Sequence, residues 1–176
     1  GAAGATGAAG SDGATGPQGP AGVAEINHLS DSLKDSDSMY IGNIPNSITD
    51  AKYNVGVGIN ILTDVTTGVR NTSVGYKALE NSTTSENNTA VGFHSLKNII
   101  GNEHSTSGGE ETNSTSVGAY ALQVARNGYN NAFGSRALIK NGFGTQNVAV
   151  GTESLKENVT GSHNVAIGNK TGAILT

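Results

Sequence analysis

Cysteine and tryptophan are both absent from this sequence of 176 residues. Without cysteine, no disulfide can stabilise the fold, and neither thiol chemistry nor a cysteine-ligated metal is available. Aromatic residues make up only 5% of the chain and the mean hydropathy is −0.27, so there is little material for a self-contained globular core. We therefore expect the core to be shared between chains or spread along an axis.

Long apolar runs and an excess of positive charge are missing as well. No stretch approaches the roughly 18 to 20 apolar residues that a membrane-spanning helix needs. The formal net charge is −4 and the charges are dispersed, which does not suit a nucleic-acid or anionic membrane surface. We therefore predict neither nucleic-acid binding nor membrane insertion. Because the chain opens at Gly1, without an initiator Met or a signal-like segment, we interpret it as a piece of a longer polypeptide.

Glycine, by contrast, is abundant, and in residues 1–22 it occupies every third position without interruption. Only glycine fits the crowded axis of a collagen triple helix, so this register predicts a collagen-like stalk and three chains per molecule. A flexible glycine-alanine linker is the alternative. Only Pro17 and Pro20 add imino rigidity, so we expect the triple helix to be weak alone. The predicted axis residues are Gly1, Gly4, Gly7, Gly10, Gly13, Gly16, Gly19 and Gly22.

Residues 23–37 are predicted to form a neck between this stalk and a wider body. The apolar residues Val23, Ile26, Leu29 and Leu33 follow spacings of 3, 3 and 4. This spacing fits a short helix or a coiled neck, and an irregular trimeric adaptor is the alternative.

A five-residue phrase recurs through residues 38–176. It is clearest as Asn-Val-Ala-Val-Gly at 147–151 and as Asn-Val-Ala-Ile-Gly at 164–168. The closing glycines of its eight copies stand at 42, 58, 75, 92, 118, 134, 151 and 168, so the period is 16 or 17 residues except for one step of 26. Fixed-period similarity of this kind predicts an all-β solenoid, or β-roll, of about eight coils.

Large and small residues alternate in seven of the eight phrases, with Tyr40 in the place of the small residue in the eighth, which is the period-two pattern of a β-strand. We predict that the β-branched face is buried and that the small face allows close approach of a second layer. The residues expected to form the shared core of a trimer are Val55, Val57, Val74, Val91, Val117, Phe133, Val148, Val150, Val165 and Ile167.

Two further positions recur in each coil. A leucine such as Leu62 or Leu155 stands four places after the closing glycine, and we assign it to a short second strand. A further glycine such as Gly68 or Gly161 stands ten places after the closing glycine, where we expect a left-handed backbone conformation.

These phrases resemble the head repeats of trimeric autotransporter adhesins, whose Val-Ala-Ile-Gly type of motif is matched at 165–168. They also resemble the Asn-Thr-Ala-Val-Gly repeats of phage tail-fibre and bacterial surface-fibre proteins, matched at 88–92. The resemblance covers residues 38–172, and residues 26–40 look like the lead-in seen in the second group. It implies a left-handed parallel β-roll, three of which pack around a common axis with valine and isoleucine inward. The present period is longer than the usual coil of the adhesin family.

Stacked coils would place residues of equal offset in columns. The column four places before the closing glycine is Asn or Ser in all eight copies, which indicates either a ladder of hydrogen-bonded amides or a turn preference. Two places after the glycine, Arg136, Glu153 and Lys170 alternate in charge, and Glu80 is followed one coil later by Lys97. We expect weak ion pairs between coils at these positions.

The 26-residue step contains an inserted loop at 99–113. Binding residues gather in inserted loops on rigid scaffolds, so Glu103, His104, Glu110 and Glu111 form a candidate surface-binding loop for a glycan or a metal. A solvated loop without a ligand is the alternative. The four histidines show no ligand spacing and the carboxylates show no obvious catalytic pair. We therefore predict no catalytic residue, no metal site and no cofactor.

The function predicted from these features is that of a structural, non-enzymatic homotrimeric fibre outside the cell. It would be a virion appendage of the phage tail-fibre type that contributes to attachment to a host surface glycan or protein. Its other partners would be further copies or the remaining parts of the same fibre. The alternatives are a bacterial cell-surface adhesin or filament subunit, and a glycan-depolymerising tailspike. An ice-binding solenoid is disfavoured because Thr72, Thr89 and Thr115 lie on the face that we expect to be buried.

Overall fold

The computed structural model describes residues 1, 32–35, 37–42, 45, 48–99 and 110–172. All regular secondary structure in these residues is β. The predicted collagen-like stretch and the neck up to residue 31 lie outside the described residues, apart from Gly1. The strands are β1 (Ser32–Asp35), β2 (Ser38–Gly42), β3 (Val55–Gly58), β4 (Thr72–Val74), β5 (Ser85–Glu86), β6 (Thr89–Val91), β7 (Asn98–Ile99), β8 (Glu110–Glu111), β9 (Thr115–Val117), β10 (Val124–Ala125), β11 (Asn131–Phe133), β12 (Val148–Val150) and β13 (Val165–Ile167).

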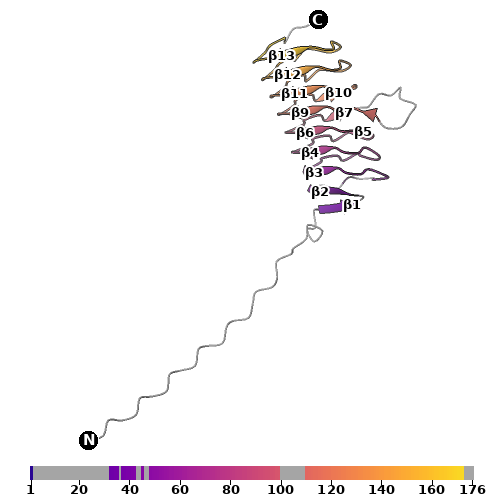
Figure 1. Ribbon diagram of the computed structural model, residues 1–176, viewed down its shortest axis with the longest axis vertical. Coiled ribbons are helices and arrows are strands. Elements are labelled where there is room, and N and C mark those ends of the chain that lie inside the picture. The colour runs from indigo at the N-terminus through magenta and orange to yellow at the C-terminus, as the bar shows by residue number, and fades with distance from the viewer. Residues whose placement is uncertain (2–31, 36, 43–44, 46–47, 100–109, 173–176) are drawn as a thin grey trace.

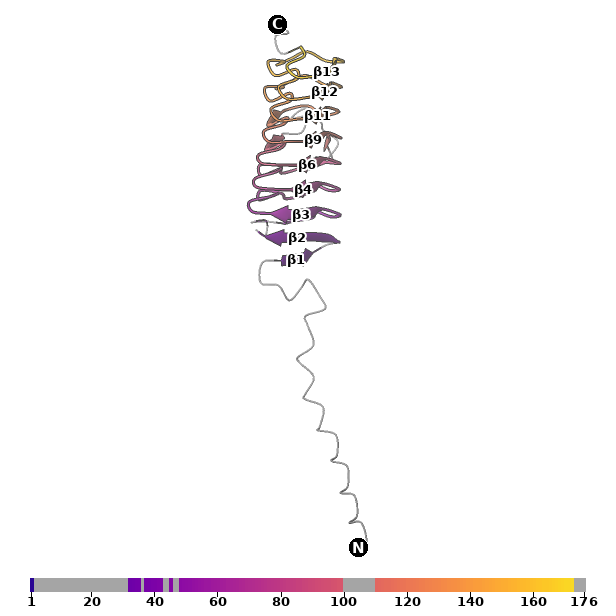
Figure 2. The same ribbon diagram turned by 90° about the vertical axis from the view of Figure 1, so that its left-hand side faces the viewer.

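The recurring phrases form one long sheet whose strand order is β1-β2-β3-β4-β6-β9-β11-β12-β13. From β2 onward every pairing is parallel, and equivalent residues lie opposite each other, as Ala149 does to Ala166. The strands stack one above another along the long axis (Figures 1 and 2). The predicted all-β parallel solenoid is therefore confirmed. It has about seven turns, because seven turns join the eight parallel strands that the sequence presents as eight coils.

The first strand departs from this pattern. Strand β1 pairs antiparallel with β2, with Leu33 opposite Tyr40, so a hairpin covers the first edge of the parallel stack. Leu33 closes the apolar spacing that is compatible with a helix, yet it lies in a strand. A covered edge offers fewer unpaired backbone groups to other chains.

The core of the single chain lies inside the coils. The middle residue of each parallel strand points inward; it is small in all of them except β2, where Tyr40 is buried, and Ala90, Ala132 and Ala149 have no exposed surface. These residues pack over a column of leucines that is also fully buried or nearly so. The small face therefore does allow close approach of a second layer, as predicted, but within one chain it is this face that is buried and the β-branched face that points outward. The leucines are Leu62, Leu79, Leu96, Leu122, Leu138 and Leu155.

The predicted short second strand at the leucines is wrong. The leucine column has φ between +46° and +52°, a left-handed conformation that no β-strand adopts. The residue two places earlier is also left-handed, for example Lys77 at φ +58° and Glu153 at φ +58°. These paired left-handed residues turn the chain sharply after each strand and carry the leucine into the coil.

The two glycine columns serve different purposes. The closing glycines have φ between +107° and +141°, and a Cβ on Gly134 would lie 2.6 Å from the carbonyl oxygen of Gly151 in the next coil. The second glycines are not left-handed, so that prediction is wrong. They permit close packing instead, since a Cβ on Gly128 would lie 2.0 Å from the Thr112 carbonyl oxygen and one on Gly161 would lie 2.3 Å from Asn158 Oδ1.

The column four places before the closing glycine forms a continuous hydrogen-bond ladder. The backbone N–H of Asn164 donates to Asn147 Oδ1 at 3.0 Å, and that of Asn147 donates to Asn130 Oδ1 at 3.1 Å. Where serine replaces asparagine the hydroxyl takes over, so Asn130 N–H donates to Ser114 Oγ at 3.1 Å. The same pattern runs from Ser38 upward. Of the two interpretations of this column, the ladder is the one that forms.

Short strands mark where the insertion leaves and rejoins the solenoid. Strand β7 pairs parallel with β10, and β5 pairs parallel with β8, on the side of the coil away from the long sheet (Figure 1). The insertion therefore begins and ends on paired backbone, although residues 100–109 lie outside the described residues.

Candidate functional surfaces

The outward face of the long sheet carries the apolar residues that the sequence assigned to a trimer core. Val55 and Val57 are each 37% exposed, whereas Val165 and Ile167 in β13 are each 70% exposed. The remaining members are partly buried or exposed at intermediate levels, namely Val74, Val91, Val117, Phe133, Val148 and Val150. All ten residues predicted to form a trimer core thus lie on one outward face. The threonines Thr72, Thr89 and Thr115 share this face. They are partly exposed, so the single chain does not bury them.

A cluster of four rings lies just beyond the ends of β4, β6 and β9. The Tyr76 and Phe93 rings stack with centroids 5.4 Å apart and planes at 18°, and His94 stacks on Phe93 at 4.2 Å. Tyr120 contacts Phe93 edge-on at 5.2 Å. The sequence analysis did not single these residues out. The available signal was an aromatic residue one or two places after each of three successive closing glycines, at 75, 92 and 118.

His94 is a histidine, and the ordinary pKa of this side chain lies near neutral pH. Burial lowers its pKa below the ordinary histidine value, and the positive charges of Lys97 and Lys77 lower the pKa further. Its Nδ1 atom is buried and has no hydrogen-bond partner among the described residues. The imidazole is therefore held in its neutral form and acts as one more ring of the stack.

Glu80 is held between cations of its own coil and of the next. It contacts Lys77 Nζ at 2.8 Å and Lys97 Nζ at 3.2 Å, so the predicted ion pair with Lys97 is confirmed. Burial raises the pKa of Glu80, but the hydrogen bonds from the two lysines outweigh this effect, and the pKa lies below its ordinary value. A carboxylate in this environment is a poor general acid, because a general acid needs a raised pKa.

Glu153 repeats this arrangement further along the solenoid. It pairs with Lys156 at 3.3 Å and with Arg136 of the preceding coil at 3.5 Å, which confirms the predicted contact with Arg136. The hydrogen bond from Lys156 is the main reason why the pKa of Glu153 is lowered, and the charge of Lys170 lowers it as well. Like Glu80, Glu153 is paired with cations rather than with a second carboxylate.

The candidate surface-binding loop is placed only in part. Glu103 and His104 lie outside the described residues, whereas Glu110 and Glu111 form β8 and pair through their backbone with Ser85 and Glu86. The backbone of these two glutamates therefore belongs to the scaffold. Among the described residues, no group of three His, Cys, Asp or Glu is placed to hold a metal ion.

The part of the chain that the structure describes contains no helix long and apolar enough to cross a membrane. Comparison of the chain with protein-family models, with curated proteins and with solved structures finds no match.

Proposed function

We propose that this chain is the subunit of a homotrimeric, non-enzymatic fibre, a virion appendage of the phage tail-fibre type that projects from a particle outside the cell. In this proposal the fibre contributes to attachment of the particle to a host surface. The solenoid forms the shaft or head, and a collagen-like stalk formed by residues 1–22 precedes it.

The outward apolar face is the observation that carries this proposal. Alanine and leucine already fill the interior of each coil, so the valines and isoleucines of the long sheet lie outside the buried core of their own chain and remain partly exposed. Burying a fully exposed valine or isoleucine contributes about 1.5–3 kcal/mol, so the part of each side chain that is still exposed contributes a fraction of this, repeated along the stack. Because each chain presents the same face, three copies around one axis would cover all of it.

The number three has separate support in the sequence. The glycines at every third position of residues 1–22 suit a structure in which three chains share an axis. The stalk and the solenoid are different stretches of the chain, and each of them favours self-association.

A trimer would also make weak attachment effective. Three copies of any contact on the inserted loop at 99–113 would act together, which raises the overall affinity without new chemistry at each site. Host surface glycans or proteins are the proposed targets, and other parts of the same fibre are the proposed structural partners.

The first test is the mass of the assembly in dilute solution. We expect sedimentation equilibrium to give three times the chain mass of 17.7 kDa. Single chains with a complete β signal in circular dichroism would contradict the proposal. Electron micrographs of the intact particle, labelled with an antibody against the solenoid, should then show the chain on an external appendage.

A further inference from the structure

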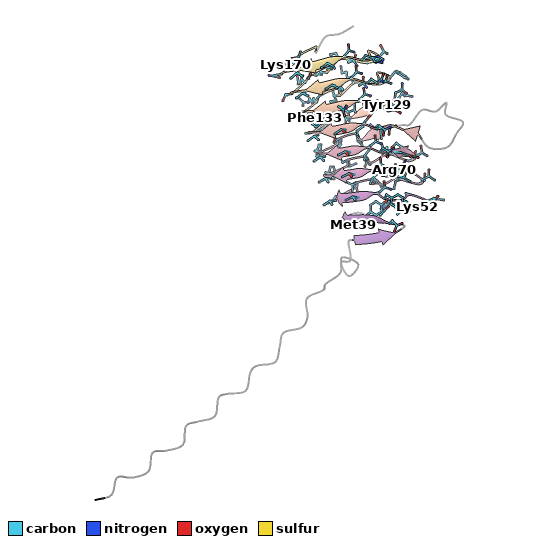
Figure 3. The ribbon with its side chains drawn as sticks, in the orientation of Figure 1. Met39, Lys52, Arg70, Tyr129, Phe133 and Lys170 are labelled. Carbon is cyan, nitrogen blue, oxygen red and sulfur yellow. The ribbon has the colours of Figure 1, made fainter. Side chains whose placement is uncertain are left out.

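Large exposed side chains stand at both ends of the outward strands. The strand-end ledge consists of Ile59, Tyr76 and Phe93, the residues directly after three closing glycines, which are 58%, 40% and 42% exposed. The strand-start corner is the column five places before the closing glycine, where Tyr53 is 57% exposed and Arg70 also stands. Figure 3 shows Arg70 and Tyr129 of this column on one side of the stack, with Phe133 and Lys170 toward the other.

The ring geometry of the ledge leaves ring surface available for a contact. The centroids of Tyr76, Phe93 and His94 lie 4.2–5.8 Å from one another, in a triangle rather than in a column. Tyr76 and Phe93 remain 40% and 42% exposed. Exposed ring surface of this kind packs well against aliphatic or aromatic protein side chains and against cations.

The strand-start corner offers a complementary surface. Arg70 Nε donates to Asn87 Oδ1 at 2.6 Å, and its Nη2 donates to Glu86 Oε2 at 2.5 Å. These contacts with the next coil fix the guanidinium while half of the side chain stays exposed. A fixed, planar cation is well suited to contact an aromatic ring. At the preceding coil, Tyr53 presents an apolar surface instead.

We propose that the strand-end ledge of each protomer packs against the strand-start corner of the next, with Ile59 against Tyr53 and Tyr76 against Arg70. This inference rests on the trimer proposed above. When three copies of a strand face one axis with cyclic symmetry, the end of each strand meets the start of its neighbour's strand, and the ring closes after three contacts. The strands lie across the long axis, so each contact joins residues of the same coil level (Figure 2).

The contact has a sharp test because the chain contains no cysteine. Tyr53 and Ile59 lie beyond opposite ends of strand β3. The strand itself spans three extended steps of about 3.3 Å each, or roughly 10 Å, whereas a disulfide needs Cα atoms within about 7 Å. Cysteines at both positions therefore cannot pair within one chain. In the proposed trimer each would pair with its counterpart on a different neighbour and link all three chains.

The experiment uses the full chain with Tyr53→Cys and Ile59→Cys together, oxidised mildly and run on a denaturing gel without reductant. We expect most chains to migrate as a covalent trimer, and each single variant to remain monomeric on the gel. The matched control, Tyr53→Cys with Phe93→Cys, places the second thiol two coils away, roughly 10 Å along the axis, and should not link.

The outcomes separate this inference from the trimer itself. Sedimentation before oxidation measures the trimer, and the gel then measures the contact. A trimeric mass without covalent trimers, or with self-linked single variants, would overturn the proposed contact and leave the trimer standing. A monomeric mass would overturn both. If the first pair disturbs the β signal in circular dichroism, Arg70→Cys with Tyr76→Cys tests the next coil level in the same way.

Discussion

The corners of the coil place the strictest demands on individual residues. At the closing glycines the backbone takes φ values that side chains rarely adopt, and the next coil leaves no room for a Cβ. At the leucine column the left-handed conformation is taken by a large residue, and burial of the leucine side chain offsets the strain. Each corner thus contains a glycine that tolerates an unusual backbone conformation and a leucine whose side chain fills the interior of the coil.

Replacing Gly134 tests this demand. Gly134→Ala puts a Cβ 2.6 Å from the carbonyl carbon and oxygen of Gly151 at φ +135°, so we expect the free energy of unfolding to fall by about 2–4 kcal/mol in urea titrations. Gly142→Ala is the matched control, since its Cβ would meet nothing closer than the Val159 carbonyl oxygen at 3.7 Å. Equal effects of the two variants would contradict the steric explanation.

His94 predicts a dependence of stability on pH. Its pKa is lowered in the folded chain, whereas in the unfolded chain it is about 6.5, so below that pH the unfolded chain binds more protons. The stabilisation is complete above about pH 6.5 and is lost as pH falls toward the folded pKa. We expect the melting temperature of the wild type to decrease from pH 7.5 to 5, and His94→Phe to weaken this decrease. An identical pH profile for His94→Phe would exclude the assignment.

Among the elements, the asparagine ladder joins successive coils most continuously. Asn147 is an example. Its Oδ1 accepts hydrogen bonds from both the backbone N–H and the side-chain amide of Asn164, and its Nδ2 donates to the Gly161 carbonyl at 2.8 Å. Each asparagine thus satisfies buried backbone groups that the strand pairing does not reach.

Truncation of one rung tests the ladder. Asn147→Ala leaves buried donors and an acceptor unpaired, and we expect a loss of about 2–4 kcal/mol in the free energy of unfolding. Asn147→Ser keeps an acceptor, as Ser114 does naturally for Asn130, and should lose clearly less. Urea titrations of both variants measure the difference. If the serine and alanine variants lose the same free energy of unfolding, the side-chain acceptor does not stabilise the ladder.

Sequence patterns predict the strands and their parallel stacking well. A regular repeat places equivalent residues of successive coils opposite each other. They predict the corners poorly. A leucine after Ala or Ser, as in Ala78-Leu79, suggests an extended segment, and nothing in the residue type indicates that Leu79 takes φ +52°. The ring cluster was missed for a related reason, since Tyr76 and Phe93 share an offset but Tyr120 does not, and only the shape of the corner brings the three together.

On the scale of the whole molecule, the proposed trimer depends on the outward apolar face. Val117→Asp would place three carboxylates close to one another on this face in the proposed trimer, where repulsion and loss of hydration oppose association. We expect sedimentation to show single chains, with the β signal in circular dichroism retained because the coil interior is untouched. Thr160→Asp adds the same charge at an exposed position away from the strands and should stay trimeric. A trimeric Val117→Asp chain would argue against this face as the interface.

The hairpin of β1 and β2 makes the two edges of the stack unequal. Among the described strands of the long sheet, each later strand pairs with the strand on either side of it, so one more unit of 17 residues would fit between two of them. Such a duplication would lengthen the solenoid by one sheet spacing, about 4.8 Å, and would leave the hairpin as it is. The length of the solenoid can therefore change in steps of one coil, while the strand pairing of the existing coils stays as it is.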